Sequence, residues 1–212
     1  MPNVTDQDPR GETLGVILAG GKAQRLGLAL KSGIQVAGQS LLERVVDAIR
    51  DDCRHILLSV GRHHKSRFHG AEDLIMLSDP GNGPASALKE MAAFAFSEMP
   101  RTKFLLTVAV DTPFFPVDFA VRAHAMMTPE LDAIIAGFGD QVYPTNGLWR
   151  LSSFARKGKD NPSAPALYSL LDKRKWAPLD YSAIRPTNPF VNINTPADLI
   201  ACNKEAKLHA AS

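Results

Sequence analysis

Residues Val16 to Lys31 read V-I-L-A-G-G-K-A-Q-R-L-G-L-A-L-K. The first half of this stretch is an apolar strand that runs into a glycine turn, and the second half presents Arg25 and Lys31. Glycines in such a turn let the main chain lie against a phosphate and point its N–H groups at the oxygens. The two cations supply compensating charge. We interpret the stretch as a loop that holds a nucleoside triphosphate.

The two best-known phosphate loops do not fit this stretch. Leu28 follows Gly27 where G-x-x-x-x-G-K-[ST] requires lysine, and no G-x-G-x-x-G is present. This argues against a P-loop NTPase and an ordinary dinucleotide dehydrogenase. A glycine turn also occurs wherever a parallel strand passes into a helix, so the turn alone does not make a phosphate site. Arg25 and Lys31 favour the phosphate interpretation.

The composition is that of a globular domain, with 212 residues, 45% of them hydrophobic and 22% charged. We expect one domain over 13–207, a flexible leader at 1–12 and a tail at 208–212. A net charge of +2 is too small to argue for nucleic acid or a membrane surface as a partner. The polar start of the chain and the lack of a bilayer-length apolar stretch predict a cytoplasmic location.

Cysteine and histidine usage gives no metal signature. Cys53 and Cys202 lie far apart and have no metal-ligand spacing, so neither a zinc site nor a disulfide framework is indicated. His63 and His64 are adjacent, and neighbouring side chains point apart on a strand or a helix. We interpret their surroundings as a solvated basic loop that leaves the same sheet edge as the glycine loop.

Strands and helices are expected to alternate along the chain. Strands are predicted at 14–18, 55–60, 74–77, 103–110 and 132–137, with a short extended piece at 34–36 and a hairpin return after residue 140. Helices are predicted at 41–49, 85–96, 116–127 and 164–176, and a last one begins after Thr195. Ser40 and Glu43 form a capping box for the first helix. The pattern predicts a three-layer α/β/α domain with a mostly parallel central sheet.

Two aspartates follow predicted strands. Asp111 ends the continuously apolar run at 104–110, which is typical of a central strand buried on both faces. A carboxylate there stands in the crevice where open α/β sheets bind ligands, and Mg²⁺ needs only one or two carboxylates besides phosphate oxygens and water. Asp79 precedes the turn P-G-N-G-P, and an aspartate that merely starts a turn is almost as good an interpretation.

Three motifs together resemble the molybdenum cofactor guanylyltransferase (MobA-like) family. They are L-A-G-G-x-x-x-R-x-G followed by Lys31, D-T-P-F at 111–114, and F-V-N-I-N-T-P-A-D-L at 190–199, and the similarity spans about 14–199. The resemblance implies a Rossmann-like nucleotidyltransferase (nucleotide-diphospho-sugar transferase) fold. It also implies transfer of GMP from GTP to molybdopterin with release of pyrophosphate, Mg²⁺ as cofactor, and other molybdenum-cofactor biosynthesis proteins as partners.

The resemblance assigns roles to residues of four separated segments. The implied catalytic residues are Lys31, Asp111 and Arg25, with Asp111 as the metal ligand. The implied nucleotide-binding residues are Leu18, Ala19, Gly20, Gly21, Lys31, Asp79 and Asp111. The implied acceptor-binding residues are Tyr143, Pro144, Asn192 and Asn194. Alternation would place Asn192 and Asn194 on one face.

Three residues depart from the family pattern. Leu30 stands where the family has aspartate, Gly61 where it has a nucleotide-binding asparagine, and Tyr143 where it has histidine. Loss of the asparagine amide leaves open a related transferase that uses CTP or a sugar-phosphate acceptor. A nucleotide-binding regulatory module without turnover is a second alternative, and retention of Lys31 and Asp111 argues against it.

Overall fold

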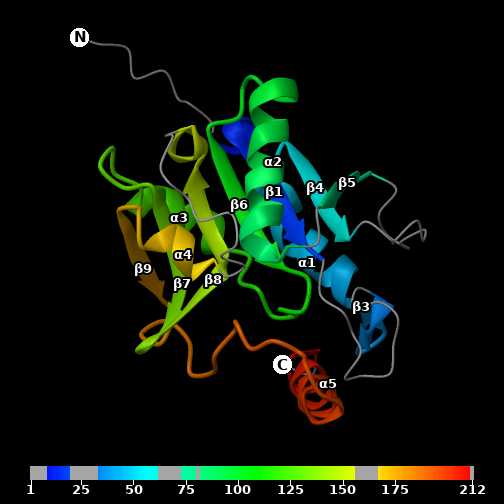
Figure 1. Ribbon diagram of the computed structural model, residues 1–212. Coiled ribbons are helices and arrows are strands. Elements are labelled where there is room, and N and C mark those ends of the chain that lie inside the picture. Colours follow the sequence, from blue (N-terminus) through cyan, green and yellow to red (C-terminus); the bar gives the residue numbers. More distant parts are fainter. Residues whose placement is uncertain (1–8, 20–32, 62–72, 80–81, 156–166, 211–212) are drawn as a thin grey trace.

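The computed structural model of the chain describes residues 9–19, 33–61, 73–79, 82–155 and 167–210. Its main feature is a sheet with helices on both faces (Figure 1). The strands of this sheet are β1 (Thr13–Leu18), β4 (His55–Gly61), β5 (Ile75–Asp79), β6 (Phe104–Ala109), β7 (Ala133–Phe138), β8 (Gln141–Arg150) and β9 (Trp176–Asp180). Their spatial order is β5-β4-β1-β6-β8-β7-β9.

The sheet is mostly parallel, as the sequence predicted. Within the described strands, β8 is antiparallel to both β6 and β7, and every other neighbouring pair is parallel. β1 lies between β4 and β6, and all six of its residues are buried. β6 occupies the middle position of the sheet, which confirms that the apolar run at 104–110 is a central strand.

Helices form a layer on each face of the sheet. The described helices are α1 (Leu41–Ile49), α2 (Pro84–Glu98), α3 (Phe119–Met126), α4 (Tyr168–Leu171) and α5 (Pro196–Ala210), together with the 3-10 helices η1 (Pro9–Glu12), η4 (Arg50–Asp52) and η5 (Leu151–Phe154). Ile17 of β1 belongs to the core that includes α1 and α3, whereas its neighbour Val16 belongs to the core that includes α2 and α4. This alternation confirms the three-layer α/β/α fold.

Local capping explains where two helices begin. Ser40 Oγ accepts a hydrogen bond from the backbone N–H of Glu43 at 3.2 Å, and Glu43 Oε2 accepts one from the backbone N–H of Ser40 at 2.8 Å. The predicted capping box of α1 is therefore confirmed. Thr195 Oγ1 accepts from the backbone N–H of Asp198 at 3.2 Å, so Thr195 caps α5 as expected.

A small third core joins α5 to the strands β2 (Gln35–Val36) and β3 (Gln39–Ser40), which pair with each other. Ile34, Val36, Ile193 and Cys202 are buried together there. The predicted extended piece at 34–36 is confirmed by β2. The C-terminal helix is thereby held close to the region that precedes α1.

The predicted helix at 164–176 is wrong at its C-terminal end. The described helix α4 ends at Leu171, and Arg174 Nη1 donates to the carbonyl oxygen of Leu170 at 3.0 Å. Trp176 begins β9, which pairs in parallel with β7 from Ala133 onward. Sheet pairing outweighs the local helical pattern here, and the cationic residues 173–175 form the connection into an edge strand instead of a last helical turn.

A bulge interrupts β8. The pairing with β7 jumps from Ile135–Gly147 to Ala136–Tyr143, so residues 144–146 lie outside the ladder. Pro144 fits inside this bulge, because no ladder N–H is required of it there.

Gly147, at the base of the bulge, admits no side chain. An added Cβ would lie 2.8 Å from Ile135 Cδ1 and 2.9 Å from the carbonyl oxygen of Ile134. Gly147→Ala is expected to lower the free energy of unfolding by about 1–3 kcal/mol, because backbone and core must shift. Urea unfolding measures this, with Gly11→Ala as control, since nothing lies within 4 Å of a Cβ at that position. Equal stability of the two variants would contradict the packing argument.

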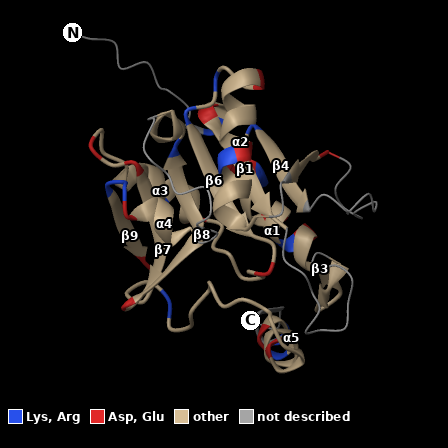
Figure 2. Ribbon diagram, in the orientation of Figure 1, with Lys and Arg blue, Asp and Glu red and all other residues tan. Residues whose placement is uncertain are grey.

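Charges of both signs are interspersed over the described part of the chain in the view of Figure 2. Within the described ranges, no helix has the length and apolarity that a membrane span requires. Cys53 and Cys202 are both free thiols.

Candidate active site

The carboxyl ends of β1, β4, β5 and β6 meet at one edge of the sheet, because these four strands are parallel. Leu18 and Ala19 lie at the end of β1 and are buried. The backbone N–H of Ala19 donates to Ser59 O at 3.1 Å, and that of Val110 donates to Leu18 O at 3.2 Å. The chain therefore stays in register between β4 and β6 up to the point where the glycine turn begins.

Part of the predicted site lies outside the described residues. This holds for Gly20, Gly21, Arg25 and Lys31, and the other positions discussed above, Leu30, His63 and His64, also lie outside them. Asp79 ends β5, and its backbone pairs with Gly61 on β4. β5 is three strand positions from β6, roughly 14 Å at the usual strand spacing, so Asp79 and Asp111 mark two ends of one edge.

Asp111 lies in the turn that follows β6, one residue beyond Val110, and is half-buried. Its carbonyl oxygen accepts a hydrogen bond from the backbone N–H of Ile193 at 3.0 Å. The segment between β9 and α5 passes below the sheet in Figure 1 and meets the end of β6 at this bond. Asp111 and the neighbours of Ile193, which are Asn192 and Asn194, are thus brought together as the sequence predicted.

A chain of side-chain hydrogen bonds reinforces this junction. Asn146 Oδ1 accepts from the backbone N–H of Ala109 at 2.9 Å, and Asn146 Nδ2 donates to Thr112 Oγ1 at 3.4 Å. Thr112 Oγ1 in turn donates to Asn192 Oδ1 at 3.0 Å. Thr112 and Asn146 are 0% exposed. The chain connects the bulge of β8, the turn after β6 and the segment that carries Asn192.

Sequence reasoning assigned no role to Thr112, although Thr112 lies in the D-T-P-F motif, and none to Asn146. The feature of the sequence that could have indicated a role is a polar residue next to buried apolar ones. Asn146, for example, directly precedes the buried stretch of β8 from Gly147 to Trp149. A buried amide requires partners for its oxygen and its nitrogen. The identity of those partners depends on the bulge, which the sequence did not predict.

Tyr143 supports the segment that carries Asn192. Its ring centroid lies 5.4 Å from that of Phe190, and its hydroxyl donates to Gln141 Oε1 at 2.6 Å and accepts from Asn188 Nδ2. Pro144 beside it is buried. Both predicted acceptor residues of β8 therefore adjoin the loop that carries the predicted asparagines.

The two asparagines differ in exposure. Asn192 is half-buried against Thr112, whereas Asn194 is exposed, and its backbone N–H donates to Asp198 Oδ2 at 2.9 Å. The segment is not a regular strand. Asn192 is held by its side chain, and Asn194 is held by the capping of α5.

The donor set at Asp111 fits a phosphate-bound magnesium ion. Mg²⁺ usually keeps several waters and is held by one or two carboxylates together with substrate phosphates. Throughout the described ranges, no group of three or more His, Cys, Asp or Glu residues could hold a metal ion by itself. The half-buried carboxylate at the carboxyl edge of the sheet suits the shared kind of coordination, in which the substrate supplies further ligands.

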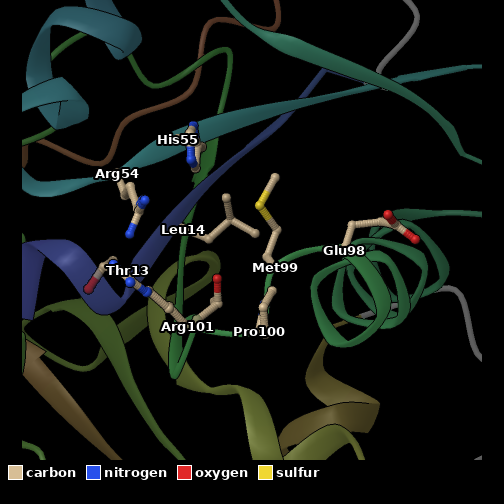
Figure 3. Close-up of a pocket in the computed structure, with 9 residues that line it drawn as sticks. Thr13, Leu14, Arg54, His55, Glu98, Met99, Pro100 and Arg101 are labelled. Atoms are coloured by element: carbon tan, nitrogen blue, oxygen red, sulfur yellow. The ribbon is translucent and has the colours of Figure 1, made fainter.

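A separate cavity of about 330 Å³ lies at the opposite edge of the sheet (Figure 3). It is lined by Thr13, Leu14, Arg54, His55, Glu98, Met99, Pro100, Arg101 and Thr102. These residues belong to the starts of β1 and β4 and to the connection between α2 and β6. The cavity is therefore distinct from the carboxyl edge of the sheet that carries Asp111.

The α/β/α layers and the mostly parallel sheet are those of nucleotidyltransferases with the nucleotide-diphospho-sugar transferase fold. A family model described as the MobA-like NTP transferase domain matches residues 15–176, and the chain belongs to this family.

Curated relatives agree with that family, and solved structures share its fold. The chain is 30% identical over 200 residues to a molybdenum cofactor guanylyltransferase of Rhodopseudomonas palustris (strain BisB5), covering 92% of this chain and 94% of the relative. It is 28% identical to a molybdenum cofactor guanylyltransferase of Rhizobium johnstonii, covering 90% of this chain and 91% of the relative. Molybdopterin-guanine dinucleotide biosynthesis protein A from Archaeoglobus fulgidus shares the fold with a TM-score of 0.71 at 17% identity, over 92% of this chain and 98% of that one. The 4-diphosphocytidyl-2C-methyl-D-erythritol synthase of Anaerococcus prevotii shares the fold with a TM-score of 0.66 at 14% sequence identity. The match covers 96% of this chain and 100% of that one.

Proposed function

We propose that this protein transfers GMP from GTP to molybdopterin, which forms the guanine dinucleotide cofactor and releases pyrophosphate. The observation that carries the proposal is the bond between Ile193 N–H and Asp111 O, which joins the predicted metal carboxylate to the predicted acceptor segment at the carboxyl edge of the sheet. The names and nearly full-length coverage of the relatives support the same substrates.

The reaction asks the protein for positioning and charge neutralisation. A terminal phosphate on the pterin is already anionic, so its attack on the α-phosphorus needs no strong general base. Arg25 and Lys31 neutralise the triphosphate, and Leu18, Ala19, Gly20 and Gly21 place backbone groups beside it. Asp79 binds the nucleotide at the far end of the edge.

Asp111 holds Mg²⁺ in this proposal. Bound there with the triphosphate, the ion would stabilise the negative charge that develops on the leaving pyrophosphate. Asp111 is suited to this role because its main chain is fixed by the bond from Ile193, so the carboxylate starts from a defined position.

The acceptor binds on the β8 side of Asp111. Asn192, Asn194, Tyr143 and Pro144 contribute to this side. Tyr143 replaces the histidine of the family, and its hydroxyl is a hydrogen-bonding group without charge at neutral pH. The side therefore recognises the acceptor phosphate and pterin through hydrogen bonds and shape more than through a local positive charge.

The substrate assignment is tested with purified protein, Mg²⁺ and GTP, CTP, ATP or UTP, each with and without molybdopterin or a sugar phosphate. We expect pyrophosphate release only in the reaction that contains both GTP and molybdopterin. Release with CTP or a sugar phosphate would retain the transferase mechanism and correct the substrate, consistent with the loss of an amide at Gly61. GTP binding without any release would favour the regulatory module.

A further inference from the structure

The chain of hydrogen bonds from Ala109 to Asn192 has a fixed direction. Its first member is a backbone N–H, which can only donate, so the group of Asn146 that faces it at 2.9 Å must be the oxygen. The amide nitrogen of Asn146 must then face Thr112 Oγ1. Amide assignments are otherwise ambiguous between oxygen and nitrogen, and the backbone anchor removes that ambiguity here.

The direction carries through to Asn192. Thr112 Oγ1 accepts from Asn146, so its single proton is available for Asn192, and the atom of Asn192 that accepts it at 3.0 Å is Oδ1. The nitrogen of the same amide is turned away from Thr112. Within the described residues no group accepts a hydrogen bond from that nitrogen. The two N–H groups of this amide are thus the donors that Asn192 can offer to a ligand.

We propose that Asn146 and Thr112 are positioning residues that fix the amide of Asn192 with its N–H donors toward the acceptor phosphate. An amide oxygen in the same place would repel an anion, so the direction of the chain selects for an anionic acceptor. The inference rests on the proposed function in one respect, the placement of the acceptor at Asn192. The direction of the chain itself is independent of any activity.

The variant Asn146→Asp distinguishes two roles of residue 146. One is to fix the direction of the Asn192 amide, and the other is only to give buried polar atoms a hydrogen-bond partner. One carboxylate oxygen would still accept from Ala109 N–H, and the other would accept the Thr112 proton. Thr112 Oγ1 would then accept from Asn192 Nδ2, and the Asn192 oxygen would face outward. Each of these groups keeps a hydrogen bond, but the direction is reversed.

The reversal is expected to depend on pH. Burial raises the pKa of a carboxyl group, so lowering the pH protonates Asp at position 146. The protonated form donates to Thr112 as the native amide does and restores the original direction. The KM of Asn146→Asp for molybdopterin is therefore expected to exceed that of the wild type at high pH and to approach it as the pH falls. The wild type measured at each pH corrects for protonation of the substrate.

Thr112→Val provides the second variant, since it keeps the shape and removes the hydroxyl. Its KM for molybdopterin is expected to rise about tenfold, the usual effect of losing one hydrogen bond to a charged group, with the KM for GTP unchanged. Thr112→Ser keeps the hydroxyl and should restore the wild-type KM. A wild-type acceptor KM in Thr112→Val, or in Asn146→Asp at every pH, would overturn the proposal.

A measurement without substrate keeps the test independent of turnover. The side-chain amide protons of Asn192, assigned in ¹⁵N–¹H spectra by their loss in Asn192→Ala, should exchange freely with water in the wild type. In Asn146→Asp at high pH one of the two should be protected, because Nδ2 then donates one of its N–H groups to Thr112. Unchanged exchange would refute the fixed direction. A wild type that exchanges as expected but releases no pyrophosphate would refute the proposed function alone.

Discussion

Replacing Asp111 with asparagine is expected to lower kcat for pyrophosphate release about a thousandfold. The substitution keeps the size of the side chain and removes the charge that would hold Mg²⁺ against the triphosphate. The main-chain bond from Ile193 to residue 111 is untouched, so the site should keep its shape. A loss of this size reflects charge stabilisation in the transition state rather than a change in fold.

Steady-state pyrophosphate release across a range of Mg²⁺ concentrations checks this expectation. The matched control is Asp140→Asn, in the exposed turn between β7 and β8, which should behave as the wild type. Circular dichroism establishes that both variants are folded. Full activity of Asp111→Asn in magnesium buffer would refute the metal assignment.

Phe190→Ala is expected to destabilise the protein by about 3–5 kcal/mol, the usual cost of deleting a buried phenylalanine. Phe190 is 0% exposed. Its ring centroid lies 6.2 Å from that of Phe115, 6.1 Å from Phe119 and 5.3 Å from Tyr181. These contacts, with Tyr143, anchor the start of the segment that carries Asn192 and Asn194.

A partly exposed ion pair lies beside the aromatic cluster around Phe190 and is linked to it through Tyr181. Tyr181 Oη donates to Asp118 Oδ1 at 2.9 Å, and Arg122 Nε donates to Asp118 Oδ2 at 2.6 Å. Partial burial opposes ionisation of Asp118, yet these two hydrogen bonds prevail and lower its pKa. Burial, reinforced by Asp118, raises the pKa of Tyr181, so Tyr181 remains a neutral donor.

Thermal unfolding and acceptor kinetics measure the effect of Phe190→Ala together. The KM for molybdopterin should rise in the fraction that stays folded, because the anchored segment loses its support, whereas GTP binding on the β1 side should be much less affected. Phe96→Ala is the control, since that ring is 47% exposed on α2 and its loss should change stability little. Equal melting temperatures for the two variants would contradict the packing account.

The elements that the sequence predicted correctly are those with a strong local signal. β1 and β6 are continuous apolar runs, and α1 begins at a capping box whose members are three residues apart. The position of Asp111 at the carboxyl edge of the sheet followed from the same signal, because the residues after a central parallel strand lie at that edge. Its role as a metal ligand stays a prediction.

The missed features depend on contacts between distant segments. β9 forms by pairing with Ala133 and its neighbours on β7, and nothing between Lys173 and Trp176 announces that pairing. The role of Thr112 depends on Asn146, which reaches Ala109 only because β8 bulges between Tyr143 and Gly147. A bulge is set by the fit of two strands, so one strand read alone does not reveal it.

The most direct test of the proposed reaction follows the α-phosphate of GTP. Protein, Mg²⁺ and molybdopterin are incubated with GTP radiolabelled at the α-phosphate or, separately, at the γ-phosphate, and the products are separated by chromatography. We expect the label of the α-phosphate to move to the pterin and the label of the γ-phosphate to appear in pyrophosphate. Retention of the α label in free guanine nucleotide, or release of the γ label as orthophosphate, would contradict it.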